Sequence, residues 1–344
     1  MKTQWMLETH GDPIGTVREF VKTVWLSAEL DGVVVPLINS HEADTSVRIL
    51  GDPEDLQRVN PFKPLMKMNA ARIFPHLLEA NPDLHLGALL RPCEMRALIE
   101  MVKHDSLALD RLLTICVDCL GTYPAEEYQW RAARKGSSHQ LAQEGLQFAR
   151  LGGIAAYRYR SACQMCISPK AHGAHLNISV LGLPARRHLL VEARDPITAD
   201  WLHLDAITDG EADLALVKQH ERTVARVVER NHRTRERIIQ GLSETLPKNV
   251  SALVNQFETC DGCQECMDNC PICAVITPRR DAEGRYLHAD IQRWMASCAG
   301  CGMCEQACPN HLPLSAIFHH IKQQVIDSFG YTSGSSQKEP APLM

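Results

Sequence analysis

The chain has 344 residues, of which 45% are hydrophobic and 22% charged, and its formal net charge is −5. These values describe an ordinary globular protein of about two domains and give no support for nucleic-acid binding, which needs a basic surface. No apolar run reaches the roughly 18 residues of a transmembrane helix. Because no basic and apolar secretory signal opens the chain, we expect a reducing cytoplasm, where the fourteen cysteines act as ligands.

The N-terminal part alternates between two hydrophobic patterns. Residues 15–30 and 67–80 carry apolar side chains at helical spacing. Apolar runs of strand length lie between and after them, at residues 32–38, 84–90, 112–117, 177–181 and 189–192. The alternation predicts an α/β domain with a mostly parallel sheet over residues 1–210.

Four cysteines of this domain are candidates for a metal site. Cys93 and Cys119 follow two of the predicted strands, and the carboxyl ends of parallel strands meet at one edge of a sheet. Cys163 and Cys166 form a C-x2-C pair in a polar segment, where a loop can chelate. We predict a third [4Fe–4S] cluster on these four residues, with zinc or inert thiols as alternatives. Cys116 lies within an apolar strand and is expected to be a core residue. A redox-active thiol pair with Cys119 is the minor alternative.

Residues 211–258 are predicted to form a helical linker. Its long helix carries six arginines, namely Arg222, Arg226, Arg230, Arg233, Arg235 and Arg237. Such a charge run indicates either a solvated helix face or a docking surface for an acidic partner.

Two copies of one cysteine motif organise the C-terminal part. Residues 260–271 read CDGCQECMDNCP and residues 298–309 read CAGCGMCEQACP. We call them the first run and the second run. Both match C-x2-C-x2-C-x3-C-P, in which three cysteines hold one [4Fe–4S] cluster and the fourth ligates the other. Structural zinc sites would need no x3-C-P continuation. The pattern predicts a bacterial two-[4Fe–4S] ferredoxin-like domain over residues 259–312. It assigns cluster A to Cys260, Cys263, Cys266 and Cys308, and cluster B to Cys298, Cys301, Cys304 and Cys270.

The segments around the second run have simpler patterns. A turn signal at residues 281–284 predicts a hairpin between residues 275–277 and 286–287. Residues 313–330 are expected to form a closing helix. Residues 331–344 are rich in Ser, Gly and Pro and are expected to be disordered.

Four segments of the α/β domain resemble one known family. They are the expected helix from Gly15 into LDGVV (30–34), GALLRPCEMRAL (87–98), ICVDCLG (115–121), and CQMC (163–166) followed by NISV (177–180). In this order they are similar to the coenzyme F420 hydrogenase/dehydrogenase β-subunit family. The resemblance covers roughly residues 10–185, and the attached ferredoxin-like domain is most similar to the formate dehydrogenase β subunits.

The resemblance implies an FAD in the α/β domain and one [4Fe–4S] cluster beside it, with Cys119 and not Cys116 as a ligand. No G-x-G-x-x-G occurs in the chain, so FAD rests on the resemblance alone. The helix start at Gly15 and Thr16 would offer amides to its phosphates, or be an ordinary helix cap. Arg91 and Pro92 would lie at the cofactor, with Arg91 neutralising phosphate, tuning the cluster or simply ending a strand.

We therefore expect an iron–sulfur flavoprotein that serves as the electron-transfer subunit of a larger oxidoreductase. The chain shows no molybdenum or nickel–iron motif, so a catalytic partner of formate dehydrogenase type would supply that chemistry. The soluble carrier would be F420, NAD(P) or ferredoxin. The alternatives are a β subunit of a hydrogenase or heterodisulfide-reductase-type complex, and a flavin-free ferredoxin-like adaptor.

Overall fold

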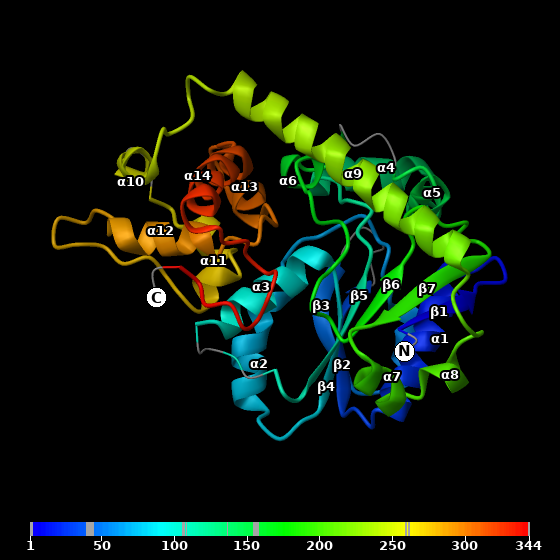
Figure 1. Cartoon of the computed structure of the whole chain (residues 1–344). Helices are drawn as coiled ribbons and strands as arrows, with labels where there is room; N and C mark the ends of the chain where they lie inside the picture. The colour runs from blue at the N-terminus through cyan, green and yellow to red at the C-terminus, as the bar shows by residue number, and fades with distance from the viewer. Residues whose placement is uncertain are drawn as a thin grey trace.

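A mixed sheet of seven strands forms the centre of the N-terminal part (Figure 1). The computed structural model describes residues 3–38, 45–104, 107, 109–135, 137–153, 158–258, 260 and 262–342. In the order β1-β7-β6-β5-β4-β2-β3, strands β2, β4, β5 and β6 pair in parallel and the three outer pairings are antiparallel. The strands are β1 (Gln4–Glu8), β2 (Gly32–Ile38), β3 (Thr45–Leu50), β4 (Leu86–Leu90), β5 (Leu112–Val117), β6 (Leu176–Ser179) and β7 (His188–Ala193). The predicted α/β domain is confirmed, with a parallel centre and antiparallel edges.

Helices cover both faces of this sheet and form most of the C-terminal part. None of them, within the described residues, is long and apolar enough to cross a membrane. The helices are α1 (Pro13–Ser27), α2 (Phe74–Ala80), α3 (Pro92–Val102), α4 (Ala125–Lys135), α5 (Ser138–Ala149), α6 (Ser161–Gln164), α7 (Pro196–Trp201), α8 (Leu204–Ile207), α9 (Leu214–Gly241), α10 (Val250–Glu258), α11 (Glu265–Asp268), α12 (His288–Ala296), α13 (Met303–Ala307) and α14 (Leu314–Phe329).

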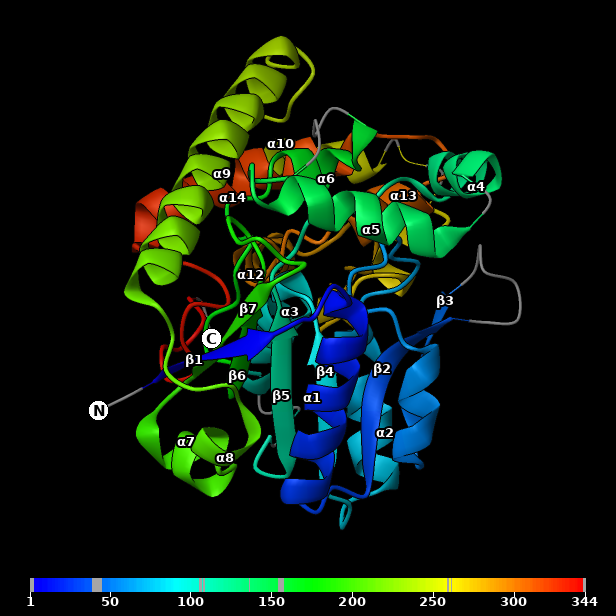
Figure 2. The same ribbon diagram turned by 90° about the vertical axis from the view of Figure 1, so that its right-hand side faces the viewer.

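The central strands are apolar on both faces because each face is covered by helices. Along β4 and β5 successive side chains alternate between two hydrophobic cores. Leu89 and Ile115 point into the core that holds α1, whereas Leu90 and Cys116 point into the core that holds α3. Figure 2 shows α1 on one side of the sheet and α3 on the other. Cys116 is only 1% exposed and is a core residue, as expected.

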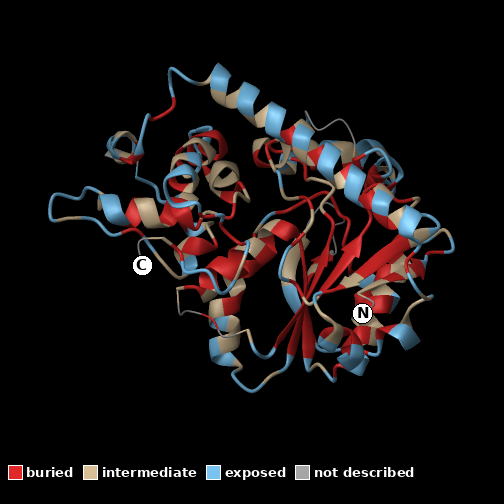
Figure 3. Cartoon of the chain, viewed as in Figure 1, coloured by how far each residue is buried: buried red, intermediate tan, exposed pale blue. Residues whose placement is uncertain are grey.

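The long helix α9 packs along the α/β domain and extends toward the C-terminal part (Figure 1). Its buried residues recur every three or four positions, which gives one inward stripe. Figure 3 shows this helix exposed on its outer side. The stripe consists of Val217, His220, Thr223, Val227 and Asn231. The predicted linker is therefore helical and is anchored on the α/β domain.

The C-terminal part does not stand apart from the sheet. Residues of α12 and α14 share one hydrophobic core with α3 and with one face of the sheet. Trp294 and Phe318 lie at its centre, with ring centroids 5.1 Å apart. Figure 1 shows α3 lying between the sheet and the orange and red helices. Because apolar burial is continuous across this boundary, the two parts stabilise each other.

Two C-terminal segments differ from the sequence expectations. The turn at residues 281–284 forms, but it closes only an isolated bridge between Arg280 and Tyr286. Residues 275–277, which were expected to pair, follow a 3₁₀ turn at residues 272–274 and form no strand. The start of the tail expected to be disordered packs against α3, through Tyr331 and Gly334. Tyr331 is 3% exposed, and its hydroxyl donates to the buried Glu100 carboxylate at 2.6 Å. Composition missed this contact because it depends on Glu100 and Lys103, two buried polar residues that lie far from the tail in the sequence.

Candidate metal centres

The first run and the second run repeat the same backbone conformation. In each, the residue before the second cysteine and the residue after it have positive φ. The values are +69° at Gly262 and +62° at Gln264 in the first run, and +64° at Gly300 and +70° at Gly302 in the second. A short helix begins directly afterwards in both, α11 and α13. Glycine tolerates this conformation, whereas Gln264 adopts it against its own steric preference.

The four cysteines assigned to cluster A line one cavity. Three come from the first run and the fourth, Cys308, comes from the end of the second, with Phe257 and Tyr286 closing the sides. Burial, together with the like charges of Cys260 and Cys263, raises the pKa of Cys266 to about 12. Metal coordination removes that penalty because the ion deprotonates the thiol. Cys263 is exposed, so this site lies at the surface.

The cysteines assigned to cluster B also come together. Burial and the charge of Cys270 raise the pKa of Cys301 to about 11, and Cys298, Cys301 and Cys270 all act on Cys304. His319 and Ser315 line the same cavity as Cys298 and Cys304. Within the described part of the chain, His319 Nε2 and Ser315 Oγ are buried without a hydrogen-bond partner. Buried donors need acceptors, and the sulfides of a cluster would supply them.

A third set of cysteines meets at the carboxyl edge of the sheet. Cys93, Cys119, Cys163 and Cys166 line one cavity, which we call the cysteine cavity. Cys116 is absent from its lining. These are the four residues that the sequence analysis grouped, and they come from three separate segments. Their convergence fits a cluster-sized group with four thiolate ligands.

The local backbone structure positions the cysteines of the third set. Cys93 lies in the first turn of α3, where the helix N-terminus favours a thiolate, although burial raises its pKa well above the usual value. Cys119 follows β5, and the Gly121 amide donates to its Sγ at 3.4 Å. Burial raises the pKa of Cys119 to about 12. Asn231 of α9 donates to the Cys166 carbonyl at 2.7 Å and so fixes the C-x2-C loop.

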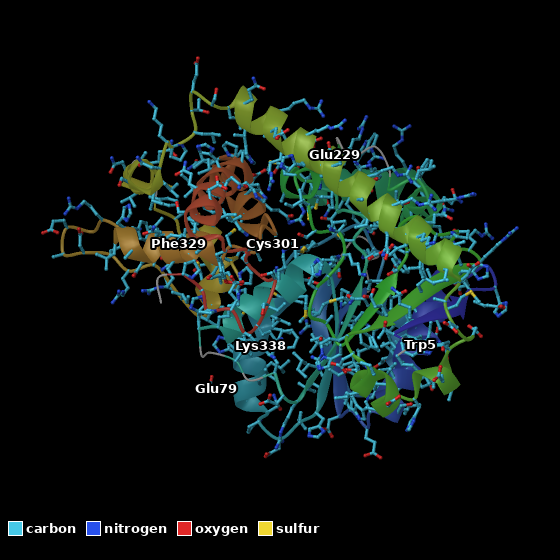
Figure 4. All side chains as sticks on the ribbon, in the orientation of Figure 1. Trp5, Glu79, Glu229, Cys301, Phe329 and Lys338 are labelled. Carbon is cyan, nitrogen blue, oxygen red and sulfur yellow. The ribbon has the colours of Figure 1, made fainter. Side chains whose placement is uncertain are left out.

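The cysteine cavity reaches the second run. Gly300 and Cys301 line it together with the third set. Figure 4 marks Cys301 at the side of the C-terminal part that faces the α/β domain. Gly302 allows this close approach, because a Cβ there would lie 2.3 Å from Ala162 Cβ in α6. The third set and the cluster B site are therefore direct neighbours.

The spacing of the cysteines bears on the zinc alternative. Across the described residues, no three Cys, His, Asp or Glu side chains converge closely enough to hold a single metal ion. A cubane cluster binds its four thiolates at four separate iron atoms, which stand further apart than four ligands on one zinc ion.

The residues predicted to hold FAD lie in two different environments. The Asp12 carboxylate caps α1 and accepts the Gly15 amide at 3.0 Å, and the Asp12 carbonyl accepts the Thr16 amide. A carboxylate at this helix end repels phosphate, so Gly15 and Thr16 form a helix cap and do not fit a phosphate site. Arg91 and Pro92 do line the cysteine cavity. The Arg91 guanidinium, however, already donates to the Lys63 and Leu65 carbonyls at 2.9 and 3.0 Å.

A second cavity of about 320 Å³ adjoins Arg91 and Met66, which also line the cysteine cavity. It lies at the ends of β2 and β3 and is lined by the basic residues Arg48 and Lys67, with Glu94 as an acidic group. Its basic lining fits phosphate better than the start of α1 does. No glycine-rich motif marks it, so the sequence analysis missed it.

The sequence analysis also missed three side chains beside the cysteines. The hydrogen bond with Cys270, burial and the like charges of Cys270, Cys266 and Cys304 raise the pKa of Cys273, and the same hydrogen bond lowers the pKa of Cys270 to about 7. Burial lowers the pKa of Arg96, but the Cys166 and Cys93 thiolates outweigh burial and raise it. Arg160 is 7% exposed and donates to Cys163 Sγ at 3.6 Å. Burial opposes a charge on Cys163, but Arg160 holds its pKa below the usual value.

The six arginines of α9 do not form one surface. Arg222, Arg226, Arg233 and Arg237 are exposed. Arg230 lines the cysteine cavity and Arg235 lies near Cys166, where burial lowers the pKa of both guanidinium groups. Only the exposed four are available to a partner.

Comparisons with known proteins agree with this picture. Residues 247–312 match the model of the 4Fe-4S dicluster domain family, which implies two [4Fe–4S] clusters. Over 98 residues the chain is 30% identical to the F420-dependent formate dehydrogenase subunit beta of Methanocaldococcus jannaschii, covering 24% of this chain and 25% of that protein. The chain thus matches about a quarter of the length of that curated relative.

A solved structure shares the fold. A chain of the F420-reducing [NiFe] hydrogenase complex from Methanosarcina barkeri, studied by xenon derivatization, superposes with a TM-score of 0.50. The match covers 69% of this chain and 91% of that chain, at 11% sequence identity, and so concerns the fold alone. The chain is thus a distant, partial relative of F420-dependent formate dehydrogenase subunit beta, with a fold found in the F420-reducing hydrogenase complex and a 4Fe-4S dicluster domain.

Proposed function

We propose that the chain is the electron-transfer subunit of a multi-subunit oxidoreductase of the F420-dependent formate dehydrogenase or hydrogenase type. It would hold three [4Fe–4S] clusters and a flavin, and would work in the cytoplasm. A [4Fe–4S] cluster accepts and releases one electron at a time, whereas a flavin exchanges two with a soluble carrier. The carrier would be F420, NAD(P) or ferredoxin, and a formate dehydrogenase catalytic subunit is the first candidate for the partner.

The observation that carries the proposal is the shared lining of the cysteine cavity. Its wall contains all four cysteines of the third set and Cys301 of the second run. Cys270 and Cys308 then cross between the two runs, which joins the cluster B site to the cluster A site. Three sites in this order support a continuous electron path from the α/β domain to the surface at Cys263.

A bound flavin would need a site for its phosphates beside the third set. The basic cavity beside Arg91 is the better candidate for its phosphates, because it opens next to the third set. Met66 lines both cavities and would separate the flavin from the cluster ligands. The capped start of α1 favours the alternative of a flavin-free relay, since the residues first assigned to the phosphates are already paired.

The surface beside cluster A is the candidate docking face for the catalytic partner. Electron transfer needs a short distance, and Cys263 is the exposed ligand of the set. Leu312 beside it is 37% exposed and gives the face an apolar element. Transient redox interfaces combine such a small apolar patch with surrounding charges.

Anaerobic iron, sulfide and flavin analysis of the purified full chain tests the proposal. Three clusters require about twelve irons per chain, and the flavin would be released on denaturation. A reconstituted content near eight irons would contradict the third cluster. A content near twelve without flavin would leave the chain as a flavin-free relay.

A further inference from the structure

Two arginines, the half-buried Arg96 and the buried Arg160, lie between the third set and the cluster B site. Arg96 belongs to α3 and points out of the same helix turn that carries Cys93. Its guanidinium donates to the Ala299 carbonyl from Nε and Nη2, at 3.2 and 2.9 Å, and to the Ser168 carbonyl from Nη1 at 3.2 Å. Ala299 lies within the second run and Ser168 follows Cys166. Arg96 therefore ties the two cysteine loops together.

Arg160 makes a second connection on the other side of the cavity. Its Nε donates to Thr122 Oγ1 at 2.8 Å, and its Nη2 lies 3.6 Å from Cys163 Sγ. Its Nη1 reaches α13, with Met303 Sδ at 3.3 Å and Gln306 Oε1 at 3.4 Å. Met303 stands between the cluster B cysteines Cys301 and Cys304. Each arginine thus contacts both sites.

No carboxylate pairs with either arginine among the described residues, although the structure holds many ion pairs elsewhere. A buried guanidinium without a counter-charge is costly. The groups of opposite charge that face the two arginines are the cysteine sulfurs, Cys166 and Cys93 for Arg96 and Cys163 for Arg160. The cysteine sites therefore serve as the counter-charge.

The C-terminal tail shields Arg96 from solvent. Gly334 packs so closely on it that a Cβ would lie 2.6 Å from Arg96 Cβ and Cγ. Excluding water lowers the local dielectric constant, and a charge then acts more strongly on its neighbours. Arg160 is 7% exposed and is covered by Met66 and Met303.

We propose that Arg96 and Arg160 set the reduction potentials of the third cluster and cluster B as a pair, while leaving cluster A unaffected. A fixed positive charge stabilises the reduced, more negative form of a cluster and so raises its potential. Because each arginine contacts both sites, the two potentials rise together, and the free-energy change of electron transfer between these clusters stays nearly constant. The inference rests on the third cluster of the proposed function.

Redox titration of the full chain, monitored by electron paramagnetic resonance, tests this pairing. Arg160→Gln and Arg96→Gln keep a polar side chain but remove the charge. We expect both variants to lower the potentials of the third cluster and cluster B, with cluster A unchanged. The Cys119→Ser variant, in which the third set is incomplete, identifies the signal of the third cluster.

Arg280→Gln is the matched control. Arg280 lines the cavity of cluster A and stacks on Tyr286, with its guanidinium carbon 4.4 Å from the ring centroid. Its removal should shift cluster A alone. Three clusters with unchanged potentials in both arginine variants would overturn the inference. About eight irons in the unsubstituted chain would instead remove the third cluster, and with it the proposed function.

Lysine variants keep the test decisive if a glutamine variant loses iron. Arg160→Lys and Arg96→Lys retain the charge but not the planar fork that joins the two loops. Potentials close to those of the unsubstituted chain would support a role of the charge. Potentials that fall despite the retained charge would show that hydrogen-bond geometry decides them, which contradicts the inference.

Discussion

The first run and the second run share one spacing and one backbone conformation, yet they occupy different surroundings. The first run lies at the surface, with Cys263 exposed and Gln264 open to solvent. The second run lies against the α/β domain, where Cys301 lines the cysteine cavity and Gly302 meets α6. Position 264 therefore tolerates a long side chain, whereas position 302 requires glycine.

The comparison shows that the motif determines the ligand spacing, whereas the residues packed around it determine how exposed each site is. The spacing supplies thiolates for a cubane cluster in both runs. The neighbours place the second run beside the third set and leave the first run beside solvent. Two stretches that share six of their twelve residues thus lie in different surroundings, and the predictions that follow test this difference.

The largest effect, a loss of iron, is expected from substituting Cys119 in the third set. Cys119→Ser should remove the third cluster and lower the iron content by about four per chain. Cys116→Ser is the matched control, because Cys116 is buried under α3 and should keep all iron, losing about 1–3 kcal/mol of stability from a buried hydroxyl. Iron analysis and low-temperature spectroscopy of both variants measure the difference. Loss of the cluster in Cys116→Ser alone would reverse the assignment.

The equivalent positions after the second cysteine of each run should respond unequally. Gly302→Ala forces a Cβ into Ala162 at a φ of +70°, so we expect a loss of about 2–5 kcal/mol from overpacking and left-handed strain. Gln264→Ala should change stability by less than about 0.5 kcal/mol. Chemical unfolding under anaerobic conditions gives both values. Equal losses at the two positions would show that the second run does not pack on α6.

The tail should protect the inner site more than the outer one. Tyr331→Phe removes the hydrogen bonds of its hydroxyl to Glu100 and Lys103, at 2.6 and 2.7 Å. A loss of about 1 kcal/mol should increase local opening roughly fivefold. Because Ser333 contacts the Cys298 carbonyl at 2.9 Å, oxidants should then bleach cluster B faster. Cluster A is the internal control, and equal acceleration at both sites would point to global unfolding.

The smallest effect is expected from reversing surface charges. It distinguishes a docking face beside cluster A from a docking face on α9. Arg280→Glu, beside cluster A, should slow reduction of or by the catalytic partner a few-fold, more strongly at low salt. The double variant Arg226→Glu and Arg233→Glu on α9 should leave this rate unchanged. Stopped-flow kinetics at two ionic strengths would measure both. A slower rate in the α9 variant alone would move the docking face to that helix.

Part of this protein follows from local sequence. The two runs carry their ligand spacing, their turns and their helix starts within twelve residues each, because a cluster loop closes through neighbouring residues. The strands and helices of the α/β domain are also visible in the sequence, because their hydrophobic periodicity is set by residues close together in the chain. Cys119 was separable from Cys116 because the strand ends between them. The resemblance of the chain to its distant relatives was also visible in these segments.

Other features required the tertiary structure, since they depend on residues far apart in the chain. The antiparallel edge strands, the packing of the tail on Glu100 and the place of Arg230 in the cysteine cavity have no local signal. Asp12 paired with the amides that were assigned to a flavin, and only the folded chain revealed that pairing. Arg96 and Arg160 read as ordinary arginines in the sequence. Their contacts span 203 residues to Ala299 and 143 residues to Met303, and such contacts form only when the cluster segment packs against α3 and α6.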